Sequence, residues 1–120
     1  MGFNAEFEST EPTREQIDAR SGPLVLEFGT PWCGFCQAAL PLIKSAFEDY
    51  PTVPHLRIED GKGRPLGRSY RVKLWPTLIF LDSGKEVARL VRPSDSHSIA
   101  DALARIATED IDSTALRASE

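Results

Sequence analysis

Runs of hydrophobic residues between polar turns divide the chain into alternating strands and helices. Residues 24–28 form a short apolar run that contains one acid, Glu27, and is flanked by Gly-Pro and Gly-Thr-Pro, which is typical of a buried strand. From residue 36 to 50, apolar residues recur at helical spacing until Pro51 ends the helix. Residues 53–58 form a second apolar run. A strand, helix and strand of these lengths predict a parallel pair with a right-handed crossover.

The second half of the chain predicts a hairpin and a final helix. Residues 77–81 are a third apolar run, 82–85 are turn residues, and 86–91 return as the hairpin partner. Ser94 or Asp95 then caps a last amphipathic helix. That helix directs four apolar residues inward: Ile99, Ala102, Leu103 and Ile106.

The N-terminal segment predicts an edge strand followed by a short helix. Phe3, Ala5 and Phe7 alternate with polar residues, and Thr13 with Gln16 fits a capping box. The sequence holds no repeat and no second core. The pattern therefore predicts one α/β domain over residues 1–107.

Composition narrows the class of protein. With 120 residues, 41% of them hydrophobic and 27% charged, the chain is long enough for one core, and it is neither disordered nor fibrous in composition. No apolar run approaches the roughly 18–20 residues that cross a bilayer. The first residues lack the basic and apolar regions of a signal peptide. We therefore expect a cytoplasmic protein that does not associate with a membrane.

Charge is unevenly distributed along the chain. The net charge is −4, and residues 108–120 hold four acids against one Arg, which predicts an acidic, flexible tail. Residues 57–73 hold six basic residues against Glu59 and Asp60. No nucleic-acid motif accompanies this stretch and the pI is about 5.2. It is therefore either a solvated basic face or a patch that faces a protein partner.

The two cysteines, Cys33 and Cys36, lie in Trp-Cys-Gly-Phe-Cys directly after the first apolar run. A structural disulfide across four residues would contribute only about 2 kcal/mol. A closed zinc site needs four ligands, and beside the two thiols the chain offers only His55 and His97, so no metal is expected. The Cys-x-x-Cys spacing alone is weak evidence for any function. Its structural setting, between a predicted strand and a predicted helix, has to distinguish the possibilities.

This order of elements, with Trp-Cys-x-x-Cys after the second strand, resembles the thioredoxin family over about residues 3–107. Glu27 stands where the family has a buried carboxylate, Pro41 stands at the family's helix kink, and Trp75-Pro76-Thr77 resembles its cis-proline loop. The resemblance implies a single-domain thioredoxin fold with a central mixed sheet of about five strands and helices on both faces. It also implies a cis Pro76, although only about 5–6% of X–Pro bonds are cis.

The resemblance further implies a thiol–disulfide oxidoreductase that reduces protein disulfides through a Cys33–Cys36 redox disulfide and needs no cofactor. Cys33, at a helix N-terminus where free N–H groups and the helix dipole favour a thiolate, would be the nucleophile. Cys36, one turn further in, would resolve the mixed disulfide. A thioredoxin reductase-like flavoprotein would supply electrons to a monomer. The alternatives are a disulfide oxidase or isomerase of an oxidising compartment, and a binding module that uses the fold without catalysis.

The residues around the pair are expected to support it. Trp32 would shield the site, and Gly34 would let a partner's backbone approach. Phe35 stands where general thioredoxins have Pro, which restores an N–H that can bond to a thiolate and shift the reduction potential. Pro76 would lie against the cysteines and leave the backbone of Trp75 free to pair with a substrate.

Substrate docking is expected around Cys33. The candidate residues are Trp75, Thr77, Arg71, Lys73 and Arg92. The three cations would steer acidic partners. Gly29 stands where many members have Trp, and Trp75 where they have Ile, Val or Thr. Either one indole has replaced the other beside the site, or the exchange is a coincidence of packing.

Glu27 is the third catalytic candidate. A buried carboxylate is costly to keep charged, so Glu27 is expected to accept the Cys36 proton directly or through one water. His55 aligns with a Lys that accompanies the acid in many members and would pair with Glu27. The alternative is a purely structural carboxylate paired with His55 or a Lys. Removing the charge, as in Glu27→Gln, is expected to preserve or raise stability.

Overall fold

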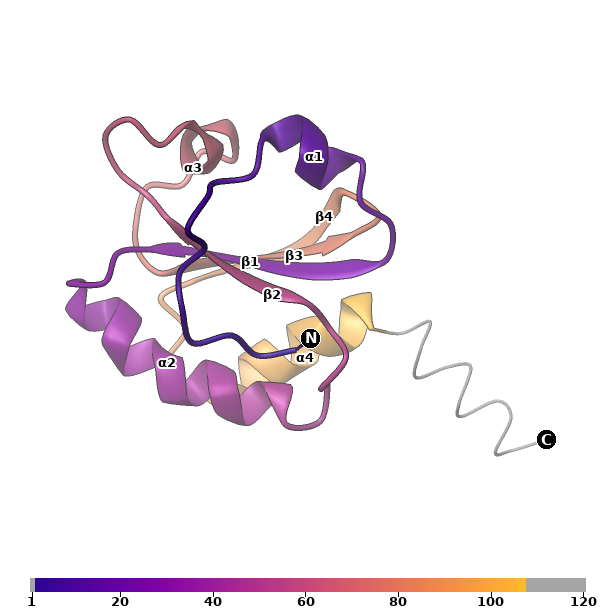
Figure 1. Ribbon diagram of the computed structural model, residues 1–120. Helices are drawn as coiled ribbons and strands as arrows, with labels where there is room; N and C mark the ends of the chain where they lie inside the picture. The colour runs from indigo at the N-terminus through magenta and orange to yellow at the C-terminus, as the bar shows by residue number, and fades with distance from the viewer. Residues whose placement is uncertain (1, 108–120) are drawn as a thin grey trace.

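A four-stranded sheet covered by helices on both faces forms the core of the protein, which we describe over residues 2–107 of a computed structural model (Figure 1). The elements in chain order are α1 (Arg14–Asp18), β1 (Pro23–Gly29), α2 (Gly34–Phe47), β2 (His55–Glu59), α3 (Pro65–Ser69), β3 (Thr77–Asp82), β4 (Lys85–Val91) and α4 (Ser96–Ile106). The strand order is β2-β1-β3-β4, with β1 parallel to β2 and the other pairs antiparallel. The parallel pair and the hairpin predicted from the hydrophobic pattern are confirmed. The predicted tail, residues 108–120, lies outside the described residues.

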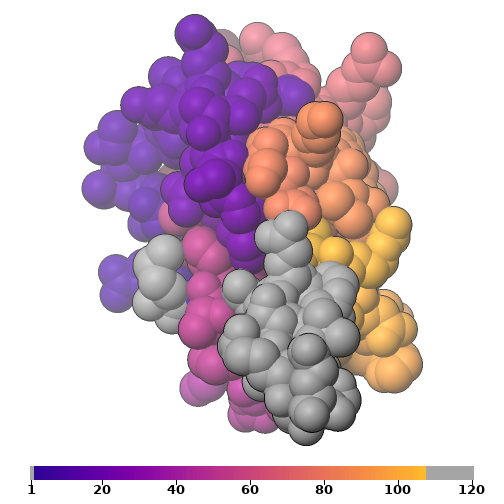
Figure 2. All heavy atoms as spheres, turned by 90° about the vertical axis from the view of Figure 1, so that its right-hand side faces the viewer, coloured from indigo at the N-terminus to yellow at the C-terminus, as the bar shows by residue number. Residues whose placement is uncertain are grey.

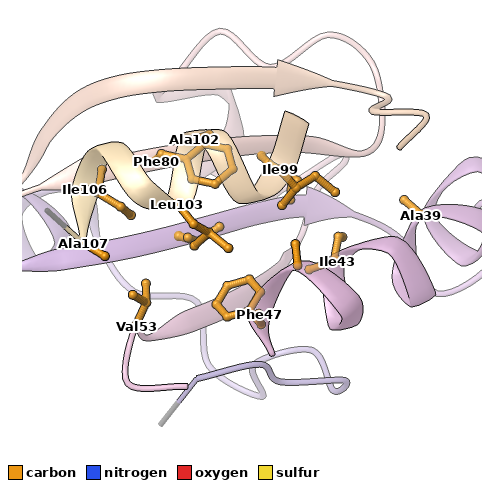
Figure 3. Packing of buried hydrophobic residues seen from close by; sticks show 13 residues of the cluster. Ala39, Ile43, Phe47, Val53, Phe80, Ile99, Ala102, Leu103, Ile106 and Ala107 are labelled. Atoms are coloured by element: carbon orange, nitrogen blue, oxygen red, sulfur yellow. The ribbon is translucent and has the colours of Figure 1, made fainter. Parts of the chain in front are cut away.

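The helices divide between the two faces of the sheet: α1 and α3 lie on one face and α2 and α4 on the other (Figure 1). The side chains of β1 alternate accordingly, because successive residues of a strand point to opposite faces. Leu24, Leu26 and Phe28 join the core under α1 and α3, whereas Val25 joins the core under α2 and α4. Figure 3 shows that second core, to which Phe47 of α2 and Leu103 of α4 both contribute their side chains. The same alternation places Glu27 and Gly29 on the α2 face.

Three local predictions have the expected geometry. Thr13 caps α1 and forms the capping box with Gln16, and Asp95 caps α4 by accepting the Ser98 N–H at 2.7 Å. A two-residue turn, Ser83-Gly84, joins β3 to β4 with φ of 52° and 80°, as tight hairpins with a right-handed twist require. Figure 2 shows this orange hairpin against the indigo-to-purple chain that leads into β1, where the Ser83 N–H donates to the Gly22 carbonyl.

The N-terminal segment differs from its prediction as an edge strand. Its only pairing with the sheet, within the described residues, is a single parallel bridge between Phe7 and Arg57. The backbone N–H of Asn4 donates instead to Nδ1 of His55 at 2.9 Å, and the Phe7 ring lies 4.3 Å from the guanidinium carbon of Arg57. Side chains of β2 therefore take the bonds that a strand ladder would use. The sheet has four strands where about five were expected.

No helix among the described residues is both long enough and apolar enough to cross a bilayer. The longest, α2 and α4, have 14 and 11 residues, which is shorter than the roughly 20 residues that a transmembrane helix needs.

Candidate active site

Cys33 forms the N-cap of α2, and its sulfur accepts the backbone N–H of Cys36 at 3.2 Å. The helix consequently begins at Gly34, two residues before the start that hydrophobic spacing predicted. A cap residue takes up an N–H that the first turn leaves unpaired, and the positive end of the helix dipole lies at the same place. Negative charge on the Cys33 sulfur is therefore stabilised by the start of its own helix.

Cys36 is buried more deeply than Cys33: the two residues are 1% and 7% exposed. Burial raises the pKa of the Cys36 thiol to about 12, and the hydrogen bond to Cys33 and the charges of Cys33 and Glu27 act in the same direction. The backbone N–H of Thr30 opposes them by donating to this sulfur. The Cys36 thiol is thus protonated at neutral pH, and it needs a proton acceptor before it can attack.

Gly29, the last residue of β1, lies against the Cys36 sulfur. A Cβ atom at position 29 would be only 2.5 Å from Cys36 Sγ, so a side chain there would displace the thiol. The sequence analysis did not predict that Gly29 makes room for the Cys36 thiol. The signal was the presence of Gly at a position where many family members have Trp. The atoms next to Gly29 belong to Cys36, and Trp75 is not among them.

The Trp75–Pro76 peptide bond is cis, as the resemblance implied. The Trp75 indole nitrogen donates to Asp60 Oδ2 at 2.8 Å, and its ring meets the Trp32 ring edge to face with centroids 5.7 Å apart. Trp32 is 73% exposed and directly precedes Cys33, which is only 7% exposed, so the indole borders the site at the protein surface.

Four large hydrophobic side chains are exposed on residues next in sequence to the cysteines, to Trp75 and to Arg92, and we call these four the exposed apolar rim. Its members are Trp32, Phe35, Leu74 and Val91. Phe35 lies between the two cysteines and is 57% exposed, and the guanidinium carbon of Arg92 lies 3.9 Å from the centre of its ring. Gly34 faces open space, since a Cβ atom there would meet nothing within 4 Å. Such a rim suits contact with another protein chain.

Glu27 is fully buried, hydrogen-bonded to His55 and ion-paired with Arg57, both residues of β2. Its Oε1 lies 2.8 Å from His55 Nε2 and 3.2 Å from Arg57 Nε. Because Asn4 donates to His55 Nδ1, the ring proton lies on Nε2 and His55 donates to the carboxylate. The pairing with His55 was predicted. Arg57 was missed as a partner, because it was counted with the basic surface stretch, whereas the structure buries it to 6% exposure beside Glu27.

The remaining docking candidates divide into exposed and buried residues. Arg71 and Lys73 are exposed and line a cavity of about 320 Å³ together with Asp60. Because Asp60 accepts the Trp75 indole N–H, this cavity lies next to the cis-proline loop. Thr77 is 1% exposed, and its hydroxyl donates to the Leu74 carbonyl at 2.6 Å. Thr77 therefore holds the cis-proline loop together and does not present its side chain to a partner.

Comparison with known proteins agrees with this geometry. The family model for thioredoxin matches residues 5–105, nearly all of the described chain. The chain belongs to the thioredoxin family. Thioredoxin of Chlamydia trachomatis serovar D is 35% identical over 80 residues, which cover 66% of this chain and 78% of that protein. Thioredoxin H7 of Arabidopsis thaliana is 28% identical over 93 residues, which cover 75% and 72%.

Among solved structures, thioredoxin 2 from Pseudomonas aeruginosa PAO1 in its reduced form is 48% identical, with a TM-score of 0.79. The match covers 89% of this chain and 99% of that one. The predicted thioredoxin fold is confirmed. As a thioredoxin-family protein the chain is a thiol–disulfide oxidoreductase that reduces protein disulfides. The comparisons favour neither an oxidase or isomerase nor a binding module.

The two thiols are the redox group of this thioredoxin-family site. Within residues 2–107, no three side chains of His, Cys, Asp or Glu come together in a way that could hold a metal ion. His97 is one of the two histidines considered as zinc ligands. Its Nε2 lies 3.4 Å from Asp101 Oδ2 on the surface of α4.

Proposed function

We propose that Cys33 is the nucleophile and Cys36 the resolving thiol of a dithiol reductant. The observation that carries the assignment is the asymmetry of the pair. Cys33 is 7% exposed and its sulfur caps α2, whereas Cys36 is 1% exposed and burial raises the pKa of its thiol to about 12. A thiol that keeps its proton at neutral pH cannot be the first to attack, since the thiolate is the reactive form.

The reaction then has two exchange steps. The Cys33 thiolate attacks one sulfur of a protein disulfide, which forms a mixed disulfide and releases the other substrate sulfur as a thiolate that takes a proton. Cys36 next loses its proton and attacks Cys33 Sγ, which releases the second substrate thiol and leaves a Cys33–Cys36 disulfide. The substrate gains two electrons and two protons. The protein supplies both electrons and the Cys36 proton, and the other proton comes from water, which took it up when Cys33 became a thiolate.

Glu27 is our candidate acceptor for the Cys36 proton. Its charge raises the pKa of Cys36, so the two groups interact, and it lies on the face of β1 that α2 covers. Its Oε1 is bonded to His55, whereas its Oε2 is buried without a hydrogen-bond partner in residues 2–107. Oε2 is therefore the oxygen available to receive a proton. Pro76, Trp32 and the backbone N–H of Trp75 would hold the substrate chain beside Cys33. The Trp75 carbonyl, which was expected to be free for a substrate, accepts Arg92 Nε instead.

The electron donor completes the cycle. A thioredoxin reductase-like flavoprotein would return two electrons to the Cys33–Cys36 disulfide, so that no cofactor has to be bound by this chain. We propose a monomer that acts in the cytoplasm on protein disulfides. Measurement of the reduction potential by equilibration with glutathione tests the direction, because a reductant needs a potential well below about −200 mV.

A trapping experiment tests the roles of the cysteines. The Cys36→Ser variant retains the nucleophile and lacks the resolving thiol, so it is expected to accumulate mixed disulfides on Cys33 with a model disulfide protein. The matched Cys33→Ser variant is expected to form none at neutral pH. Mass spectrometry of non-reduced digests identifies the bonded cysteine. Adducts on Cys36 of Cys33→Ser, without adducts in Cys36→Ser, would reverse the assignment.

A further inference from the structure

Arg92 is fixed at the edge of the exposed apolar rim by three contacts. Its backbone N–H donates to the Pro76 carbonyl at 2.9 Å, its Nε donates to the Trp75 carbonyl at 2.8 Å, and its guanidinium carbon lies 3.9 Å from the centre of the Phe35 ring. The residue has a φ of 50°, which residues with a side chain seldom adopt. An exposed arginine is thus held in one place, against the loop and the dipeptide that define the active site.

The terminal nitrogens of Arg92 are unused. Within residues 2–107, Nη1 and Nη2 make no hydrogen bond and no ion pair. The exposed Arg14 and the half-buried Arg89 differ in this respect, since Arg14 is paired with Asp18 and Arg89 with Glu86. Arg68 and Arg71 are also exposed and unpaired within residues 2–107, but no contact comparable to those of Arg92 with Trp75 and Phe35 holds their side chains. Arg92 therefore carries an uncompensated charge on a side chain that is already ordered.

A guanidinium whose Nε is occupied still presents two parallel N–H groups at its end, and that fork fits a carboxylate. Most exposed arginines lose side-chain entropy when they bind, which reduces the net gain. The contacts to Trp75 and Phe35 have already removed that freedom from Arg92. A carboxylate that reaches Nη1 and Nη2 would therefore bind to a pre-organised group.

A shallow groove runs from this fork along α2. Its volume is about 310 Å³, and it is lined by Phe35, Ala38, Ala39, Leu42, Arg92, Pro93 and Ser94. Arg92 is the only charged residue among them. Because Phe35 lies two residues after Cys33, a chain bonded to Cys33 and lying in this groove passes the guanidinium. One residue near the substrate cysteine would then contact Arg92.

We propose that Arg92 is a specificity residue that binds the side-chain carboxylate of a disulfide substrate, so that disulfides with Asp or Glu close to the attacked cysteine are preferred. The inference rests on the proposed function, in which Cys33 attacks the substrate. It deepens that function by naming the substrate class. The carboxylate contact is direct, which separates it from long-range steering by the exposed basic residues of 62–73.

Paired peptide substrates test the proposal. Cyclic peptides closed by one disulfide, with both termini blocked, carry Gln at the three positions on either side of each of their two cysteines. A matching set replaces one Gln at a time with Glu, so that each pair differs by one carboxylate. The second-order rate constant for oxidation of the reduced protein is measured for each peptide. For the wild type we expect at least one Glu peptide to react about two- to fivefold faster than its Gln partner, as an ordered charge-assisted contact at an exposed site predicts.

Three variants assign that preference to the fork of Arg92. Arg92→Gly suits the left-handed backbone and is expected to lose the preference, as is Arg92→Gln, while Arg92→Lys keeps the charge without the fork and retains only part of it. Lys85→Gln is the control, because it removes the same charge from the opposite end of the seven-residue β4, about 20 Å away. It is expected to leave the preference intact. Thermal unfolding of each variant verifies that it is folded.

The outcomes separate this inference from the proposed function. Equal rates for every Glu and Gln pair in the wild type, or a preference that survives in Arg92→Gly, would overturn the role of Arg92 and leave the disulfide exchange intact. Failure of the wild type to react with any peptide disulfide would contradict the proposed function itself. A preference that Lys85→Gln also abolishes would show long-range attraction in place of a direct contact.

Discussion

The indole nitrogen of Trp75 donates to the carboxylate of Asp60 over 2.8 Å, and this bond connects the cis-proline loop to the loop that follows β2. The same residue receives Arg92 Nε on its carbonyl, so it is held from two sides. Gly67 of α3 makes the arrangement possible, because a Cβ atom there would overlap Asp60 Oδ1. Since Trp75 also meets Trp32, the position of Asp60 determines how the rim beside Cys33 is shaped.

Removal of the Asp60 carboxylate is expected to loosen the cis-proline loop. Asp60→Ala leaves the partly buried indole N–H unpaired, so we expect a loss of about 1 kcal/mol in the free energy of unfolding and a slower first exchange step. Asp60→Asn retains an acceptor and removes only the charge, so it separates the hydrogen bond from electrostatics. Urea denaturation and stopped-flow tryptophan fluorescence measure the two effects. Equal behaviour of the Ala and Asn variants would show that the charge, and not the bond, matters.

Glu27→Gln is expected to separate the two steps of exchange. Glutamine cannot accept the Cys36 proton, so resolution should slow by at least about tenfold near pH 7, whereas attack by Cys33 should change by less than about twofold. Rapid mixing with a model disulfide, followed by acid quench and mass spectrometry, measures the amount of mixed disulfide over time. If the mixed disulfide decays as fast as in the wild type, Glu27 is a structural residue only.

The same variant is expected to be less stable, which reverses the expectation from the sequence. An unpaired carboxylate in an apolar strand would destabilise the fold, but Arg57 Nε lies 3.2 Å from Glu27 Oε1 and is itself buried. Loss of one partner leaves the other charge uncompensated, at a cost of about 3 kcal/mol. A double-mutant cycle with Arg57→Gln tests this by urea denaturation. The double variant should lose less than the sum of the single variants, and simple additivity would contradict the pairing.

Gly29→Ala is expected to disturb Cys36 without touching Cys33. The added Cβ would lie 2.5 Å from the Cys36 sulfur, so either the thiol or the end of β1 must move. Overpacking of this kind costs about 1–3 kcal/mol in the reduced state, and resolution should slow with it. Gly34→Ala is the matched control, because a Cβ there meets nothing within 4 Å. Equal stability of the two variants would show that the thiol relocates freely.

The sequence predicted those parts of the fold that depend on local pattern. Alternation and helical spacing located β1, α2 and the hairpin, and Thr13 and Asp95 were identified as caps from short-range chemistry. The N-terminal segment was assigned wrongly as a strand, since it bonds to side chains of β2 that lie 51 and 52 residues away in sequence. The alternation of apolar and polar residues contains no information about a residue distant in sequence that competes for the backbone hydrogen bonds.

The features of the site fall into the same two groups: those that could be predicted from the sequence, and those that depend on tertiary contacts. The cysteine pair, the cis Pro76 and the Glu27–His55 pair follow from motif and family resemblance. The proximity of Gly29 to Cys36 and of Arg92 to Phe35 depends on how a strand end and a loop meet the start of α2. Those contacts join positions 7 and 57 residues apart, and no pattern along the chain records them.

The raised pKa of Cys36 leads to a prediction about stability at high pH. An unfolded thiol titrates near 9, whereas the folded thiol holds its proton until about 12. Between these values the folded state binds more protons than the unfolded state, so the free energy of unfolding of the reduced protein falls as the pH rises. The loss is about 1.4 kcal/mol per pH unit at most. Below pH 9 both states are protonated and Cys36 contributes no pH dependence.

Comparison with Cys36→Ala isolates this effect from the rest of the molecule. Burial also raises the pKa of Tyr70, which lowers stability above pH 10 in the same direction, but Tyr70 is present in both proteins. The difference in free energy of unfolding between wild type and Cys36→Ala should therefore be constant up to about pH 8.5 and shrink from pH 9 to 10. Urea denaturation under a reductant measures it. Parallel curves over that range would mean that Cys36 titrates as an ordinary thiol, and resolution would then need no special proton acceptor.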